Sequence, residues 1–128
     1  MSHLISLIVG VIALLHLYIA WFEMFAWTTK GPEVFSSFPS ELFEPTVSMA
    51  ANQGLYNGFL AAGLIWSLFI RDSVWKYRVA LCFLLFVAVA GIFGAFTVSQ
   101  RILFVQTLPS ALGIALIMFY RKTRASEH

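Results

Sequence analysis

The chain has 128 residues, of which 60% are hydrophobic and 11% are charged, whereas ordinary soluble domains carry roughly 25% charged residues. With a mean hydropathy of +0.86, this composition excludes a soluble domain and predicts an integral membrane protein surrounded by a lipid bilayer. The length allows about four spans of roughly 20 residues in one domain, residues 1–128. Basic residues are not interleaved with aromatic ones, so nucleic acid is not expected as a partner.

Four apolar segments predict four membrane-spanning helices. In chain order they cover roughly residues 4–27, 45–70, 79–98 and 102–120. The first exceeds the apolar region of a signal peptide and lacks an Ala-x-Ala ending, so we expect a retained span. Gly31 and Pro32 are expected to stop this helix, Pro45 to start the next, and the polar tail 121–128 to fray. Because the link 99–101 is very short, its helices must be antiparallel neighbours. We predict an all-α, antiparallel four-helix bundle in the membrane.

Lysine and arginine are divided unequally between the two sides of this bundle. One side holds six of them: Arg71, Lys76, Arg78, Arg121, Lys122 and Arg124. Only Lys30 and Arg101 fall on the other side. The positive-inside rule therefore places both termini in the cytoplasm and the loop 28–44 outside.

The outer loop 28–44 carries too many apolar side chains for a solvated tether. They are Val34, Phe35, Phe38, Leu42 and Phe43. The loop therefore either packs on the end of the bundle, dips into the membrane interface, or forms a lid over a pocket. Loops of this length are often functional but need not be, and the sequence leaves these alternatives open.

Polar side chains gather in the first two spans. His16 and Glu23 are two helical turns apart and share a helix face, and Glu23 lies roughly 10 Å nearer the outer surface. The second span runs the opposite way, so Asn57 falls level with His16, while Asn52 and Gln53 fall level with Glu23. We expect His16 to pair with Asn57, and Glu23 to pair with Asn52 or Gln53.

Nearly all polar groups of the four spans fall in their outer half, which predicts a polar cavity that opens outward. Polar and ionisable groups at bilayer depth mark a functional site by default. The candidate catalytic residues are His16 and Glu23. The candidate ligand-binding residues are Asn52, Gln53, Tyr56, Asn57, Arg101 and Gln106.

Small residues and a proline shape the packing of these spans. Gly54, Gly58 and Ala62 form a small-xxx-small pattern, which allows another helix to approach closely. Pro109 removes one helical hydrogen bond and frees a carbonyl one turn earlier. Gly91, Gly94 and Gly113 thin the packing of the third and fourth spans.

A purely structural interpretation of the polar groups stays open. Glu23 also fits a salt bridge with Arg101 that holds two helices together, and a buried ion pair is weak support for a function. His16 also fits a core histidine that donates to Asn57, and the amides fit interhelical hydrogen bonds of about 0.6–2 kcal/mol each.

Two stretches of the chain resemble a known family. They are ALLHLY (13–18) with EMFAW (23–27), and AANQGLYNGFLA (50–61). With them, the chain resembles the small bacterial four-span membrane proteins of domain of unknown function 1304. The resemblance covers essentially the whole chain. It implies four spans and a bacterial membrane, here the inner membrane, with these polar positions as the family signature. It implies no activity.

Three classes of function fit the sequence. The favoured one is a pocket for a small apolar or amphipathic molecule, in which Glu23 or His16 transfers protons, as in an isomerase or hydrolase. Known nucleophile motifs are absent, so whether the protein is an enzyme stays open. The second is a proton-coupled transporter, because one Glu in the first of four spans resembles the small multidrug resistance proteins. The long outer loop and unequal charges depart from that pattern. The third is a structural or partner-binding subunit.

No metal or cofactor is expected from the sequence. His16 is the one histidine within a predicted span, so two histidines of one chain cannot hold a haem there, although ligation by a single histidine stays open. The single cysteine, Cys82, cannot form a disulfide within the chain. The sequence does not decide whether the protein forms a homo-oligomer.

Overall fold

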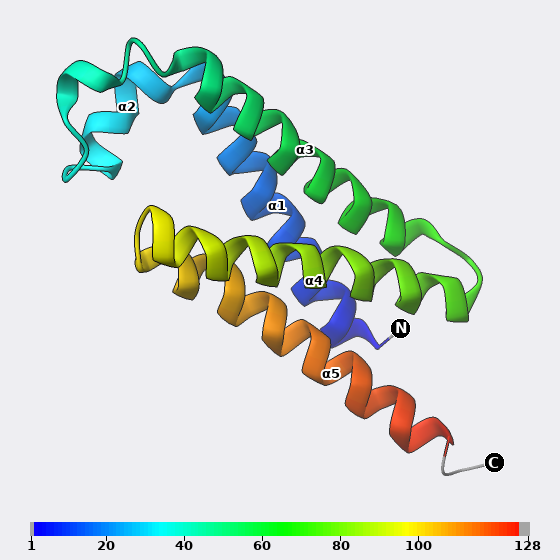
Figure 1. The fold of residues 1–128 in the computed structure, drawn as a ribbon. Helices are drawn as coiled ribbons and strands as arrows, with labels where there is room; N and C mark the ends of the chain where they lie inside the picture. The colour runs from blue at the N-terminus through cyan, green and yellow to red at the C-terminus, as the bar shows by residue number, and fades with distance from the viewer. Residues whose placement is uncertain (1, 126–128) are drawn as a thin grey trace.

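The structure, a computed structural model, describes residues 2–125, and all regular elements within them are helical. In chain order these are α1 (His3–Phe25), α2 (Trp27–Val34), the 3₁₀ turn η1 (Ser40–Leu42), α3 (Val47–Phe69), α4 (Ser73–Thr97), the π-helical turn η2 (Leu103–Thr107) and α5 (Leu108–Ala125) (Figure 1). The start of α1, the α3–α4 link and the end of α5 lie at one end, which we call the termini end. The segment 26–46 and the α4–α5 hairpin lie at the opposite, loop end. The predicted all-α antiparallel four-helix bundle is confirmed.

The long helices match the thickness of a bilayer. Three helical segments are long and apolar enough, by length and composition, to cross a membrane: His3–Phe25, Ser73–Thr97 and Leu103–Thr123. The helix α3 has 23 residues, as does α1, and reaches about 34 Å at 1.5 Å per residue. It is less apolar because it carries the amides of Asn52, Gln53 and Asn57. The composition and these helices identify an integral membrane protein.

The helix α1 ends before the expected stop. It is interrupted at Ala26, whose φ is −127° and whose N–H donates to the carbonyl of Phe22. The chain then forms α2, which contains both Gly31 and Pro32. Pro32 lacks only its own N–H, and the helical ladder continues around it because the Phe35 N–H donates to the Gly31 carbonyl at 2.8 Å. The expectation that Gly31 and Pro32 stop the first helix is therefore wrong.

Other helix boundaries also differ from the expected ones. The helix α4 begins at Ser73 because Asp72 caps it: the Asp72 Oδ1 accepts a hydrogen bond from the Trp75 N–H at 2.8 Å, which satisfies a donor that helix starts leave free. Part of the tail that is expected to fray, from Arg121 to Ala125, continues α5. The remainder of that tail, 126–128, lies outside the described residues.

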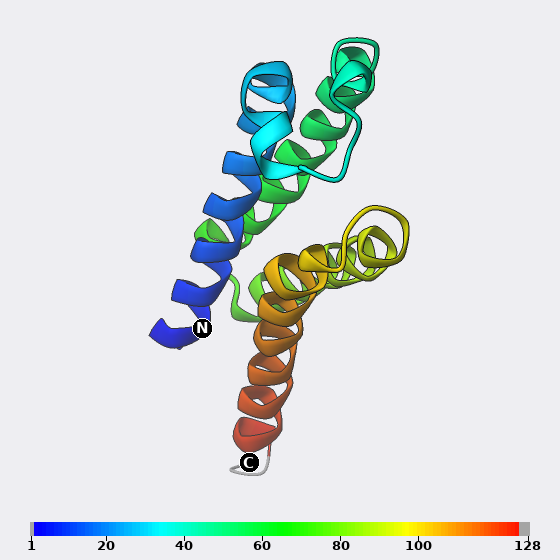
Figure 2. The same ribbon diagram turned by 90° about the vertical axis from the view of Figure 1, so that its left-hand side faces the viewer.

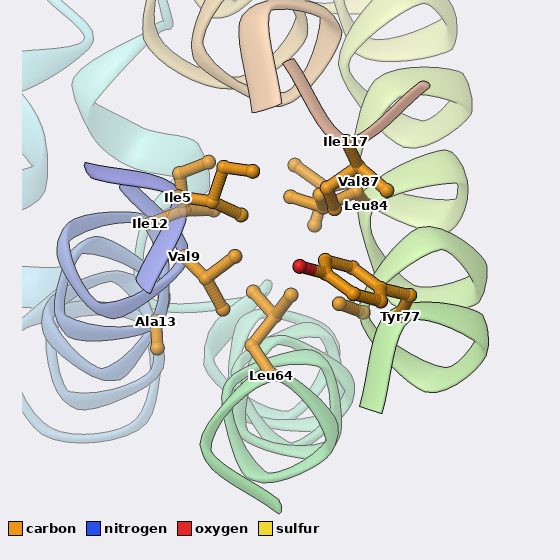
Figure 3. Close-up of a cluster of buried hydrophobic side chains, with 10 residues drawn as sticks. Ile5, Val9, Ile12, Ala13, Leu64, Tyr77, Leu84, Val87 and Ile117 are labelled. Carbon is orange, nitrogen blue, oxygen red and sulfur yellow. The ribbon is translucent and has the colours of Figure 1, made fainter. Parts of the chain in front are cut away.

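The hydrophobic core fills the half of the bundle near the termini end. All four long helices contribute to it: Ile5, Val9, Ile12 and Ala13 from α1, Leu64 from α3, Tyr77, Ala80, Leu84 and Val87 from α4, and Ile117 from α5. Figure 3 shows these side chains pointing toward one another. Close van der Waals packing of this kind is what holds helices together in lipid. It closes the bundle at the termini end.

The four helices form two pairs that diverge toward the loop end. The helix α1 packs mainly on α3, and α4 packs on η2 and α5. Figure 2 shows the α1–α3 pair and the α4–α5 pair meeting in the termini half and separating toward the segment 26–46 and the hairpin. The divergence leaves room for a cavity in the loop half.

Candidate functional site

Small residues bring α1 and α3 into close contact beside the site. A Cβ on Gly54 would lie 2.9 Å from the carbonyl oxygen of Ala20 and 3.1 Å from the Cβ of Glu23. One turn further along α3, a Cβ on Gly58 would lie 3.9 Å from the Ala20 side chain, an ordinary contact. Gly54 therefore sets the distance between the two helices at the level of Glu23.

The central feature of the site is a hydrogen bond between α1 and α3. The Nδ2 amide of Asn57 donates to the Oε2 of Glu23 at 2.8 Å. The same amide also donates to the main-chain carbonyl of Gln53 at 3.3 Å. Asn57 is buried, with 5% of its surface exposed, and Glu23 is half-buried. Asn57 therefore holds one oxygen of the Glu23 carboxylate in a fixed position.

The expected partners of Glu23 and Asn57 are wrong, and one property of helices explains both errors. Side chains tilt toward the N-terminus of their own helix. The N-terminus of α1 lies at the termini end and that of α3 at the loop end, so Glu23 and Asn57 lean toward one another, whereas His16 and Asn57 lean apart. The heights of the backbones along the two helices are close to those expected, since Glu23 lies beside Gly54, the residue after Gln53. The expected bonds from His16 to Asn57 and from Glu23 to Asn52 or Gln53 do not form.

His16 is completely buried deeper in the bundle. Its Nδ1 lies 2.9 Å from the carbonyl oxygen of Ile12, and because a carbonyl only accepts, Nδ1 carries the hydrogen and donates. The Nε2 atom has no hydrogen-bond partner among the described residues. His16 is also two helical turns from Glu23, roughly 10 Å along α1, and does not line the cavity.

A cavity of about 980 Å³ lies between the diverging helix pairs. Its polar lining includes Glu23, Gln53, Tyr56 and Asn57 on the α1–α3 side, and Thr97 and Gln106 on the α4–α5 side. The remainder is mostly apolar, with several phenylalanines from α3 and α4: Phe59, Phe83, Phe86 and Phe93. An apolar cavity with a few converging polar groups is typical of a small-molecule site.

The wall opposite Glu23 is shaped by the π-helical turn η2. Pro109 has no N–H, so the helix cannot make its regular bond one turn earlier, and the Leu108 N–H donates instead to the carbonyl of Leu103. A Cβ on Gly91 of α4 would overlap the Thr107 side chain. The close approach at Gly91 thus seats η2 on α4, with Gln106 at the cavity wall. Single π-helical turns are frequent at functional sites.

An aromatic cluster lies at the loop end of the bundle, beside the cavity. It contains Phe22, Trp27, Phe35, Phe38 and Phe43, with ring centroids of contacting pairs 5.1–6.3 Å apart. The indole Nε1 of Trp27 donates to the Oγ1 of Thr46 at 2.9 Å and so fixes the start of α2 against the start of α3. The loop 28–44 thus packs on the bundle end while Phe35 and Phe38 line the cavity. Trp27, Thr46 and these rings are not among the sequence candidates, although the density of aromatic residues in the loop was the available signal.

Two further candidates lie apart from the cavity. Asn52 is exposed on α3, and Arg101 is exposed in the α4–α5 hairpin; neither lines the cavity. Within residues 2–125, Glu23 forms no ion pair with Arg101, and its one hydrogen bond comes from Asn57. The structure therefore brings together Glu23, Gln53, Tyr56, Asn57 and Gln106, and leaves out His16, Asn52 and Arg101.

Comparison with known proteins assigns the family. The model of the family described as "Protein of unknown function (DUF1304)" matches residues 10–118. The chain belongs to this family. The match spans all cavity-lining positions, from Glu23 to Gln106, so the site lies within the DUF1304 region.

One curated relative is similar over most of its length. It is "Uncharacterized protein YpaA" of Lactococcus lactis subsp. lactis (strain IL1403), which is 29% identical over 97 residues, covering 74% of this chain and 80% of YpaA. No solved structure matches the chain significantly. The resemblance to the DUF1304 family expected from the sequence is confirmed.

Proposed function

We propose that the protein binds a small, partly apolar molecule in the cavity between the two helix pairs. This proposal rests on the incomplete hydrogen bonding of the Glu23 carboxylate. Its Oε2 is held by Asn57, while its Oε1 has no hydrogen-bond partner among the described residues and the side chain lines the cavity. A bound molecule that donates a hydrogen bond would complete this carboxylate.

The fold itself gains little from an acid at this position. An ionisable group in the membrane interior is costly, and replacing buried charges by well-packed apolar side chains is often neutral or stabilising. The close packing of α1 on α3 at Gly54 does not involve the Glu23 carboxylate, because the contacts come from Ala20, Met24 and the Cβ of Glu23, which a glutamine also has. A ligand-binding role explains the carboxylate better than a structural role.

Glu23 is also the group best placed for proton transfer in this cavity. Asn57 orients one oxygen, and the second oxygen is free to exchange a proton with a bound molecule. His16 does not line the cavity. We therefore assign any acid–base chemistry to Glu23, with Gln53, Tyr56 and Gln106 orienting the polar atoms of the ligand.

We further propose that the protein lies in the bacterial inner membrane with both termini in the cytoplasm. Arg71, Lys76, Arg78, Arg121 and Lys122 belong to the termini end, whereas Lys30 and Arg101 belong to the loop end. The positive-inside rule supports a cytoplasmic termini end. The cavity would then lie in the outer half of the membrane and admit molecules from the outer leaflet.

Cysteine labelling tests this orientation. In a Cys82→Ala background, we expect a membrane-impermeant maleimide to label Ser36→Cys on intact spheroplasts, and to label Lys122→Cys only after permeabilisation. Both positions are exposed and lie at opposite ends of the bundle. Labelling of both cysteines from the same side would refute the orientation.

Retention of a co-purifying molecule tests the binding proposal. Wild-type protein extracted in mild detergent is expected to retain a molecule that native mass spectrometry detects as a discrete added mass. Glu23→Gln removes the carboxylate, and Ala90→Phe places a ring in the cavity. Each should reduce retention at least about tenfold, the effect of losing about 1.4 kcal/mol of binding free energy.

Two matched variants control for unspecific effects. Glu33→Gln removes an exposed acid outside the cavity, and Ala115→Phe adds a ring on an exposed face of α5. Both should retain the molecule as the wild type does. Equal retention in all the variants, or none in the wild type, would contradict the proposal.

A further inference from the structure

We infer that the occupant of the cavity is a small amphiphilic amine that carries a single positive charge. The inference rests on the proposed function, which it narrows to one chemical class. The charges that face the cavity are of one sign: among the described residues that line it, Glu23 has the sole carboxyl group, and no lysine, arginine or histidine is present.

The two basic side chains at the loop end, Lys30 and Arg101, do not line the cavity. The Nζ of Lys30 lies 5.3 Å from the ring centroid of Trp21, and Trp21 does not line the cavity. Arg101 is exposed in the hairpin. An anionic ligand would therefore meet one carboxylate and no counter-charge, whereas a cation would neutralise Glu23. In a low-dielectric site this difference in charge dominates recognition.

The surroundings of Glu23 suit an ammonium group in particular. Trp27 follows Glu23 by four residues along the chain and also lines the cavity, and aromatic faces attract cations within about 6 Å of the ring centroid. An ammonium has three donors. The free Oε1 of Glu23 accepts one, and the side-chain oxygens of Gln53 and Gln106 are available acceptors on the two walls.

A metal ion and a phospholipid headgroup fit less well. Within residues 2–125, no three His, Cys, Asp or Glu side chains lie close enough together to hold a metal ion. The phosphate of a phospholipid would find no basic partner in the cavity. The phenylalanine-rich remainder of the lining instead matches the apolar part of a simple amine, whose burial contributes roughly 25 cal/mol per Å².

Three probes with one carbon skeleton test the charge. They are 4-phenylbutylamine, 4-phenylbutanol and 4-phenylbutyrate, titrated by calorimetry into the full-length protein in phosphatidylcholine nanodiscs, with empty nanodiscs as the reference. We expect the amine to bind at least about tenfold more tightly than the alcohol, because charge-assisted hydrogen bonds are roughly twice as strong as neutral ones. The carboxylate should bind weakest.

Variants separate this inference from the proposed function. Glu23→Gln should reduce the preference for the amine over the alcohol to less than about threefold, Glu33→Gln should preserve it, and Ala90→Phe should abolish binding of both probes. If the alcohol binds as tightly as the amine and Ala90→Phe still abolishes binding, the cavity is a ligand site and the amine inference fails. If no probe binds, or Ala90→Phe changes nothing, the proposed function fails with it.

A fourth titration distinguishes a free amine from a lipid headgroup that also carries a primary ammonium. Nanodiscs that contain phosphatidylethanolamine in place of half the phosphatidylcholine present a primary ammonium next to a phosphate. We expect the affinity for 4-phenylbutylamine to change by less than about twofold. Loss of amine binding in these nanodiscs would show that the headgroup occupies the site and would overturn the assignment to a singly charged amine.

Discussion

Replacing Gly54 by alanine is expected to destabilise the protein by about 1–3 kcal/mol, the range for overpacking a closely packed interior. The added Cβ would lie 2.7 Å from the Met24 side chain and 2.9 Å from the carbonyl oxygen of Ala20. A backbone oxygen cannot move aside without shifting α1. The variant should show a lower midpoint of unfolding in detergent and weaker ligand retention, because α1 carries Glu23 away from Asn57.

Gly58→Ala is the matched control for this prediction. It lies one turn further along the same helix, and its added Cβ would make only an ordinary contact of 3.9 Å with Ala20. Since alanine is a better helix former than glycine by about 1 kcal/mol, this variant should be as stable as the wild type or more stable. Equal losses at both positions would show that α1 and α3 do not approach closely at Gly54.

Asn57→Ala is the second variant with a large expected effect. It leaves the Oε2 of Glu23 without its hydrogen bond and should cost about 1–3 kcal/mol, the range for a buried polar group that loses its partner. Glu23→Gln should cost less than about 1 kcal/mol, because the side-chain oxygen of glutamine still accepts from the Asn57 amide. Urea or thermal unfolding in the same detergent measures both effects.

The alternative structural role of Glu23 makes the opposite prediction. If Glu23 bridged Arg101, Glu23→Gln would lower stability strongly, and the double reversal Glu23→Arg with Arg101→Glu would restore much of the loss. Since Arg101 is exposed and forms no ion pair with Glu23 within residues 2–125, we expect no such restoration. A rescue by the reversal would establish the ion pair.

Much of the fold follows from the sequence because apolar composition and helix length are strong constraints in a membrane. Backbone groups in lipid must be satisfied within a helix, so the apolar segments predict the four long helices. The alternation of the four spans and the very short link 99–101 predict which helix ends lie together. Residue counting also places Glu23 level with Asn52 and Gln53, since every helix rises by 1.5 Å per residue, and in the structure Glu23 lies beside the next residue, Gly54.

The details of the site depend on features that counting residues along the helices does not predict. The bond between Glu23 and Asn57 arises from the tilt of side chains, which acts in opposite directions on antiparallel helices. The divergence of the helix pairs depends on where side chains join them: the core at the termini end contains residues of all four long helices, whereas Gly54 packs α3 only on α1, within one pair. The turn at Ala26 that starts α2, and the aromatic cluster around Trp27, depend on tertiary packing that local propensity does not determine.

We propose that Glu23 serves a bound molecule rather than the stability of the fold. The most direct test measures the unfolding midpoint and the retained mass on one preparation of Glu23→Gln, beside the wild type. We expect an unfolding midpoint close to that of the wild type, together with loss of the co-purifying molecule. A strongly lowered midpoint in a protein that still retains the molecule would contradict this proposal.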